Sequence, residues 1–161
     1  YSSAASDVYK RQIANEVRDK TYPFTLRFIA FGSEEIGLFG SRFHVNSLMP
    51  KEIQKLRAML NFDALGTGLV LRILGDAWLG DTVINYGKTN GIAVQRLLSL
   101  DAGTSSDHAP FREAGVPVLF FLADDFSRIH TEEDKLEFVE PQLLGNPAFL
   151  TIGLLDFLSH R

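Results

Sequence analysis

The stretch FIAFGSEEIGLFGSRFHV, Phe28 to Val45, joins an apolar run to two adjacent glutamates and then to a glycine-punctuated apolar segment. The run FTLRFIAF, residues 24–31, is rich in aromatic and β-branched residues, which predicts a buried strand. Residues 36–48 place apolar side chains on one side of a predicted helix, which Pro50 ends. A buried strand that leads through two carboxylates into a helix is typical of an α/β sheet with polar groups at its strand ends.

The rest of the chain alternates expected strands with expected helices. Strands are predicted at residues 56–62, 69–74, 92–98 and 116–122. Helical segments are predicted at 13–18, 81–90, 110–113 and 141–160, the last interrupted around 145–147. This alternation predicts an α/β fold in which a mainly parallel, twisted sheet is flanked by helices.

Composition excludes several classes of function. The 161 residues suffice for one domain, 45% of them are hydrophobic, and the formal net charge is −4. No cluster of basic residues suggests a nucleic-acid partner. No apolar run reaches the roughly 18 residues that a membrane helix needs. The absence of cysteine excludes disulfides and thiolate metal sites.

The first twelve residues differ in kind from the rest. YSSAASDVYKRQ, residues 1–12, shows no clear periodicity and resembles a translated sequencing-library adaptor. We therefore expect residues 1–12 to be a non-native leader, outside the fold. Residues 13–161 are then the part of the chain that belongs to the domain.

Polar residues follow three of the expected strands. Glu34 and Glu35 come after the first, Asp63 directly after the second, and His130 a few residues after VPVLFFL. Ligands of open α/β sheets collect beyond the carboxyl ends of the strands, so these side chains are expected at one rim. Oxygen and nitrogen donors without cysteine suit zinc, or less selectively manganese or cobalt.

Two adjacent glutamates can then have different roles at one metal site. One binds the metal, while the other takes a proton from a water whose pKa the metal lowers to about 7. Each residue alone also has a simpler interpretation. A glutamate pair is favoured at any helix start, Asp63 suits a turn, and His130 suits an exposed surface. The joint placement after strands favours a common site.

Four motifs in this order carry a family resemblance: FIAFGSEEIGLFGS, NFDALG, SSDHAPFREAGVPVLFF and IHTEED. Together they resemble family 28 of the metallopeptidases, which are di-zinc aminopeptidases with glutaminyl cyclases and some carboxypeptidases as relatives. The resemblance spans roughly residues 24–134. It implies a phosphorylase/hydrolase-like zinc exopeptidase fold, of which residues 13–161 form the C-terminal part of a single catalytic domain.

The resemblance also implies roles for individual residues. Glu34 matches the general base, Glu35 and His130 match ligands of one zinc, and Asp63 matches a ligand of a second zinc. The implied reaction is hydrolysis of the N-terminal peptide bond of a peptide or protein by metal-activated water. An extracellular or cell-envelope location is implied in the same way.

Asp107 and His108, in SSDHAPF, have two interpretations. They resemble family residues that do not bind the metals, and they would then orient ligands or shape the cleft. Alternatively, the residues around them cap the short helix expected at Pro110. The sequence leaves both open.

The chain departs from the family in two respects. It has no histidine before His44, so an upstream histidine and the bridging aspartate are missing, which we interpret as N-terminal truncation. Such a piece is expected to bind zinc poorly and to be inactive alone. Ile129 stands where many relatives have a tyrosine whose hydroxyl assists the oxyanion. Two alternatives to an aminopeptidase remain: a glutaminyl-cyclase-like acyltransferase and a non-catalytic, peptidase-like binding domain.

Overall fold

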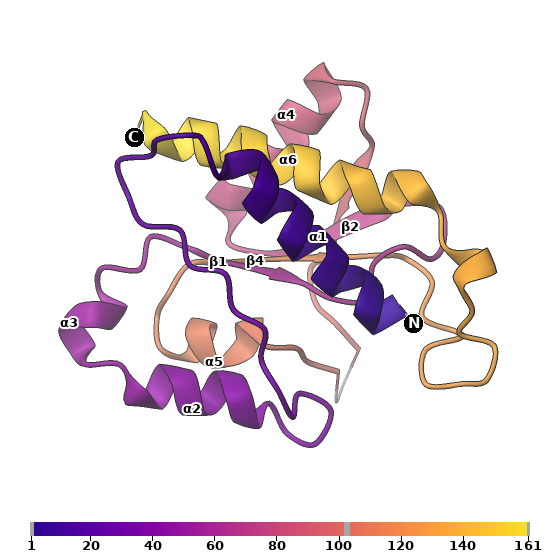
Figure 1. The fold of residues 1–161 in the computed structure, drawn as a ribbon, viewed down its shortest axis with the longest axis horizontal. Helices are drawn as coiled ribbons and strands as arrows, with labels where there is room; N and C mark the ends of the chain where they lie inside the picture. Colours follow the sequence, from indigo (N-terminus) through magenta and orange to yellow (C-terminus); the bar gives the residue numbers. More distant parts are fainter. Residues whose placement is uncertain (1, 102–103, 161) are drawn as a thin grey trace.

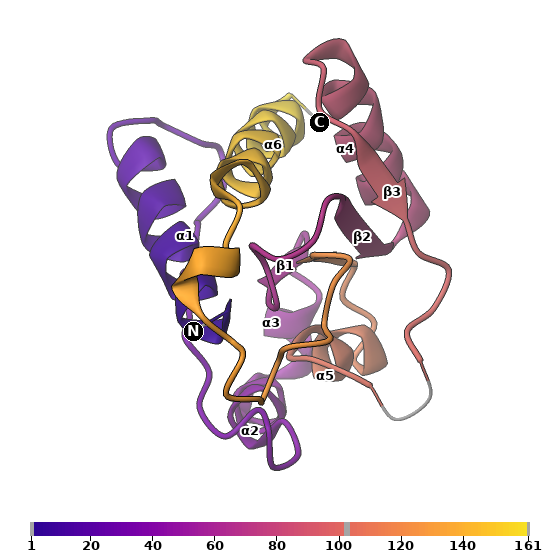
Figure 2. The same cartoon turned by 90° about the vertical axis from the view of Figure 1, so that its right-hand side faces the viewer.

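The computed structural model describes residues 2–101 and 104–160 and shows three layers (Figure 1). A four-stranded sheet lies between helices α1, α4 and α6 on one face and α2, α3 and α5 on the other, as the turned view also shows (Figure 2). The elements are α1 Ser2–Val17, α2 Phe39–Ser47, α3 Pro50–Ile53, β1 Met59–Phe62, β2 Leu71–Gly75, α4 Ala77–Thr89, β3 Val94–Arg96, α5 His108–Glu113, β4 Val118–Leu122, the 3-10 helix η1 Leu136–Phe138 and α6 Pro141–Ser159. In this described part, no helix combines the length and apolar character needed to cross a membrane.

The sheet has the order β1-β4-β2-β3. β1 pairs in parallel with β4, and β2 pairs in parallel with β3, whereas β2 and β4 are antiparallel. Two of the three pairings are therefore parallel, and the predicted α/β class with helices on both faces is confirmed. The parallel β1–β4 pair places the carboxyl ends of these two strands at the same edge of the sheet.

The core is centred on β4, whose five residues VLFFL are all buried. Phe121 is fully buried and its ring stacks on that of Phe62 at 5.1 Å between centroids. Leu150 and Leu154 of α6 join the same apolar cluster from above the sheet. Phe120 and Phe121 are core residues, with exposed fractions of 4% and 0%.

The strand predicted at residues 24–31 is not present. The segment is extended, yet no backbone group of residues 21–31 pairs with another backbone group within the described chain. A cavity lies between it and β1, the strand beside which it runs. A strand exists only where a neighbour completes its hydrogen bonds, and the local sequence does not encode that neighbour.

Residues 13–18 are expected to be the tail of a helix, and residues 13–17 are the end of α1, which begins at Ser2; whether residues 1–12 are native stays a prediction. Two other helix predictions need correction. α6 runs unbroken through Pro147, because that residue lies on the buried side and packing outweighs its missing hydrogen bond. α2 begins at Phe39 rather than Ile36, since residues 34–38 form a turn.

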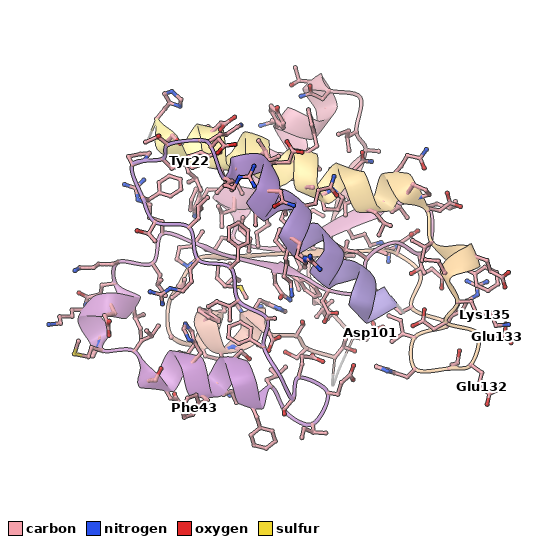
Figure 3. All side chains as sticks on the ribbon, viewed as in Figure 1. Tyr22, Phe43, Asp101, Glu132, Glu133 and Lys135 are labelled. Carbon is pink, nitrogen blue, oxygen red and sulfur yellow. The ribbon has the colours of Figure 1, made fainter. Side chains whose placement is uncertain are left out.

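The apolar side predicted for α2 faces outward. Ile36, Phe39 and Phe43 are 72%, 60% and 77% exposed, and Figure 3 shows Phe43 projecting away from the molecule. The buried face of this helix is instead formed by Ser41 and Val45. His44 packs against the rings of Phe31 and Phe111, at 5.7 and 5.9 Å between ring centroids. The described residues thus supply no cover for the outer stripe.

Candidate active site

Asp63, the first predicted site residue, lies where β1 and β4 both end at the same edge of the sheet. Asp63 follows β1 directly, and its backbone N–H donates to the Phe121 carbonyl of β4 at 3.3 Å. The loop that follows β4 returns His130 to the same side of the molecule as Glu35. The rule that polar residues gather beyond the carboxyl ends of parallel strands therefore holds for this pair of strands.

The Asp63 carboxylate is held by a chain of hydrogen bonds. Its Oδ1 accepts from the Ala64 N–H at 2.8 Å, and its Oδ2 accepts from the Ser106 hydroxyl at 2.8 Å. The Ser106 Oγ in turn accepts from Asn61 Nδ2 at 2.8 Å. Asn61 and Ser106 are only 6% and 2% exposed, so the chain is shielded from water. This arrangement fixes the direction of the carboxylate.

Sequence reasoning missed Asn61 and Ser106. One signal was available, because an asparagine inside the apolar run LRAMLNF must find a partner if the run is buried. Asn61 also lies two residues before Asp63 and therefore on the same side of the strand. The identity of the partner, 45 residues further along the chain, requires the folded structure.

Glu34 has an unusually high proton affinity. Burial, followed by the negative charges of Asp63, Glu35 and Asp107 in that order, raises its pKa from the ordinary 4.5 to about 7. These carboxylates therefore lie near enough to repel one another. A carboxyl group that titrates near neutral pH is suited to accept a proton and to return it.

Glu35 and His130 form a direct contact. The Glu35 Oε2 lies 3.1 Å from His130 Nε2, and the two side chains are 59% and 66% exposed. An exposed pair of this kind contributes little stability. Both are metal-binding residue types, and their donor atoms already lie together at the open side of the molecule.

Backbone strain is concentrated around these residues. Of the described residues other than glycine, Ser33, Leu38, Ala64 and His130 have positive φ, between 51° and 63°. Ser33 precedes Glu34, and Ala64 follows Asp63. Such positions are uncommon and cluster at functional sites, where the surrounding structure imposes them.

The loop that presents His130 is anchored at its base. Asp124 Oδ1 accepts from the Leu69 and Val70 N–H groups at 2.7 and 3.0 Å. Burial acts to raise the pKa of Asp124, but these backbone hydrogen bonds outweigh it and lower the pKa. Further along, Arg128 pairs with Asp125 at 2.8 Å and its guanidinium carbon lies 4.3 Å from the centroid of the Phe138 ring.

Asp107 and His108 lie at the start of α5 and differ in environment. Burial raises the pKa of Asp107, and its Oδ1 has no hydrogen-bond partner within the described residues. His108 is 1% exposed, and its ring stacks on Phe120 at 4.8 Å. Burial, followed by the charge of Arg112, lowers the pKa of His108 to about 4, so the ring is neutral at pH 7.

These environments bear on the two interpretations of the motif. Asp107 makes no side-chain cap to α5. Its charge instead acts on Glu34. The neutral His108 ring stacks on Phe120 of β4, while Ser106, two residues earlier, is the one that contacts Asp63. These contacts favour the interpretation that the segment shapes the cleft, which stays a prediction.

The described residues supply some, but not all, of the ligands that a zinc ion needs. A catalytic zinc takes three protein ligands, and in the part of the chain that is described no three histidine, aspartate or glutamate side chains are arranged to hold an ion. Glu35 and His130 supply two adjacent donors. Ile129 offers no hydroxyl beside them. A complete set of ligands would require residues from outside this chain.

The sequence profile described as Peptidase family M28 matches residues 5–154. The chain belongs to this family. Aminopeptidase YwaD of Bacillus subtilis is 35% identical over 136 residues, which are 74% of this chain and 29% of that protein. Family membership accounts for the co-occurrence of the EE, NFDALG, SSDH and IHTEED motifs.

Solved structures of M28-like proteins share the fold. A zinc aminopeptidase from Bacillus subtilis has a TM-score of 0.85 at 25% identity, covering 96% of this chain and 40% of that one. A glutaminyl cyclase from an Acidobacteriales bacterium has a TM-score of 0.62 at 26% identity, covering 77% of this chain and 46% of that one. This chain therefore spans less than half the length of YwaD and of each of these two proteins of known structure.

Proposed function

We propose that this chain contributes half of the catalytic site of a zinc-dependent aminopeptidase. The observation that carries the proposal is the Glu34 carboxyl, whose pKa is raised to about 7 beside Asp63 and beside the Glu35–His130 contact. The M28 family and its relatives named as aminopeptidases support the reaction class. The substrate is then the N-terminus of a peptide or protein.

Glu34 acts as the general base in this proposal. It accepts a proton from the attacking water and returns it to the amine that leaves as the peptide bond breaks. Zinc, when bound, polarises the scissile carbonyl and makes the water more acidic. Glu35 and His130 hold one ion and Asp63 contributes to the site of a second, with the Ser106–Asn61 chain fixing its orientation.

The 161-residue chain alone is a poor catalyst in this proposal. Two adjacent donors do not make a zinc site, and Glu34, Asp63 and Asp107 repel one another. The remaining ligands come from the rest of the protein. We further propose, on the family resemblance alone, that the whole protein acts outside the cell or in the cell envelope.

The test uses the full-length protein with zinc and an aminoacyl anilide substrate. Glu34→Gln is expected to lower kcat by about 10²–10⁴-fold with zinc content unchanged, because the variant cannot accept a proton. Glu132→Gln, on the exposed loop near His130 that Figure 3 shows, is the matched control and is expected to retain activity. Unchanged turnover in Glu34→Gln would remove the base from the proposal.

The glutaminyl cyclase structure favours one competing function. Its similarity covers 77% of the chain, and the reaction also moves protons at an N-terminus. A cyclase would convert an N-terminal glutaminyl peptide to the pyroglutamyl form and release ammonia. Such a product, without release of free amino acids from anilides, would replace the aminopeptidase proposal with this one.

A further inference from the structure

The turn that carries Glu34 is fastened to the first turn of α2 by backbone hydrogen bonds. The N–H groups of Phe39 and Gly40 donate to the carbonyls of Ser33 and Gly32 at 3.2 and 3.1 Å. The first N–H groups of a helix have no partner inside the helix, so these bonds satisfy donors that the helix itself leaves open. The backbone that leads into Glu34 is therefore held by the start of a helix.

Gly40 lies so close to this turn that position 40 has no room for a side chain. A Cβ atom added at Gly40 would overlap the Gly32 carbonyl oxygen and lie 2.9 Å from the Gly32 nitrogen. Both are backbone atoms, which cannot rotate out of the way as the end of a side chain can. Gly40 itself is helical, so the contact, and not the backbone conformation of Gly40, requires a glycine.

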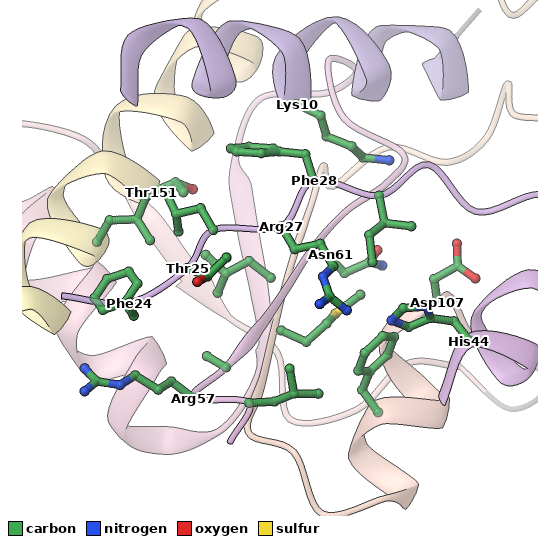
Figure 4. Close-up of a pocket in the computed structure, with 18 of the residues that line it drawn as sticks. Lys10, Phe24, Thr25, Arg27, Phe28, His44, Arg57, Asn61, Asp107 and Thr151 are labelled. Atoms are coloured by element: carbon green, nitrogen blue, oxygen red, sulfur yellow. The ribbon is translucent and has the colours of Figure 1, made fainter. Parts of the chain in front are cut away.

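Of the two partners in this contact, α2 is the more firmly held. Arg42 pairs with Glu113 of α5 at 3.1 Å. The His44 ring lies 5.9 Å from that of Phe111, also of α5, at the wall of the cavity beside β1 that Figure 4 shows. Residues 32–33 are exposed, and their carbonyls are held by α2. A side chain at position 40 would therefore displace the turn rather than the helix.

We propose that Gly40 is a positioning residue for Glu34: its missing side chain lets α2 hold the turn where the Glu34 carboxyl reaches the site. The inference rests on the proposed function, in which Glu34 is the general base. Ser33 and Leu38, both with φ of 59°, lie on either side of Glu34 in this turn. Such a backbone persists only where the surrounding structure imposes it, and the bonds from α2 supply that restraint.

The test measures kcat, KM and zinc content of the full-length protein with an aminoacyl anilide substrate. Gly40→Ala is expected to lower kcat by about 10–100-fold, because a displacement of about 1 Å at a catalytic group can cost about 10² in rate. KM should stay within about twofold, since Glu34 acts after the substrate is bound. Gly145→Ala, which adds the same methyl group to α6 in open space, is the matched control and should retain activity. Loss of zinc from Gly40→Ala would assign Gly40 to the metal site and overturn the proposal.

The Glu34→Gln background separates positioning of Glu34 from general damage to the site. If Gly40 acts only through Glu34, Gly40→Ala should lower the residual kcat of Glu34→Gln by less than about twofold. A general distortion of the site would lower kcat by the same factor in both backgrounds. Equal factors in the two backgrounds, or an unchanged kcat in the single variant Gly40→Ala, would overturn the proposal.

Gly40→Ala is expected to fold, because alanine favours a helix more than glycine does. Circular dichroism and the melting temperature check this. If the variant does not fold, Gly40 is replaced by glycolic acid through nonsense suppression, which exchanges the N–H group for an ester oxygen and adds no side chain. Loss of this one neutral hydrogen bond should lower kcat by about 3–10-fold, and only where Glu34 is present. An unchanged kcat in the ester variant would then overturn the proposal.

The same measurements distinguish failure of this inference from failure of the proposed function. A Glu34→Gln variant that loses turnover while Gly40→Ala keeps it would remove only the positioning role of Gly40. A Glu34→Gln variant with unchanged turnover would remove the general base, and with it any role of Gly40 that acts through Glu34.

Discussion

Replacing Glu34 by glutamine should stabilise the metal-free chain, by an amount that grows as the pH rises above about 4.5 and is complete above about pH 7. The folded-state pKa of Glu34 is raised from 4.5 to about 7, so the folded protein favours the protonated carboxyl. Below about pH 4.5 the group is protonated in both the folded and unfolded states and has no destabilising effect. As the pH rises towards 7 the unfolded chain releases this proton more easily, and stability falls until the folded-state pKa is passed.

The magnitude follows from the size of the pKa change. At about 1.4 kcal/mol per pKa unit, the rise from 4.5 to about 7 sets an upper limit of about 3 kcal/mol. Glu34 is only partly buried, and solvent screens its repulsion by Asp63, Glu35 and Asp107. We therefore expect the glutamine variant to gain about 1–2 kcal/mol in the free energy of unfolding at pH 8.

Urea denaturation at pH 4.5 and pH 8 measures the effect. The difference in unfolding free energy between Glu34→Gln and the wild type should be near zero at pH 4.5 and about 1–2 kcal/mol at pH 8. Glu132→Gln, an exposed residue of the same charge, should differ from the wild type by less than about 0.5 kcal/mol at both values. An unfolding free energy of Glu34→Gln equal to that of the wild type at pH 8 would refute the argument that folding raises the pKa of Glu34.

Three other outcomes are expected. Ser106→Ala should lower the unfolding free energy by about 1–3 kcal/mol in urea denaturation, since its buried amide and carboxylate neighbours lose their shared partner, while exposed Ser105→Ala should have little effect. In α6, Gly153→Ala should lower the melting temperature because a Cβ there would overlap the Tyr86 ring, whereas Gly145→Ala, with open space around it, should gain about 0.5–1 kcal/mol in the free energy of unfolding. Chelation of the full-length protein should abolish anilide hydrolysis, and zinc should restore it; activity that survives chelation would contradict the proposed zinc dependence.

The elements that sequence reasoning placed correctly are those whose signal is local. VPVLFFL became β4 because a strand buried on both faces is a continuous apolar run. The run 24–31 carries the same signal, and yet it forms no strand. The difference lies in the neighbour: β4 has β1 and β2 on its two edges, while 24–31 faces a cavity.

Burial was harder to predict than helix formation. Ile36, Phe39 and Phe43 have the spacing of a core-facing stripe, but they are exposed on the described chain. Periodicity shows that a helix has an apolar side and does not show what covers it. The buried side of α2 is set by contacts with α5, which the sequence places more than 60 residues away.

In the candidate site, too, the sequence predicted the local features and not the contacts between distant segments. Placement at strand ends brought Asp63 into consideration, and its N–H bond to β4 confirms where it lies. The Asn61–Ser106 chain could not be foreseen, because it depends on which loop passes over the end of β1. The roles of Glu34, Glu35, Asp63 and His130 stay predictions, supported by their proximity and charge.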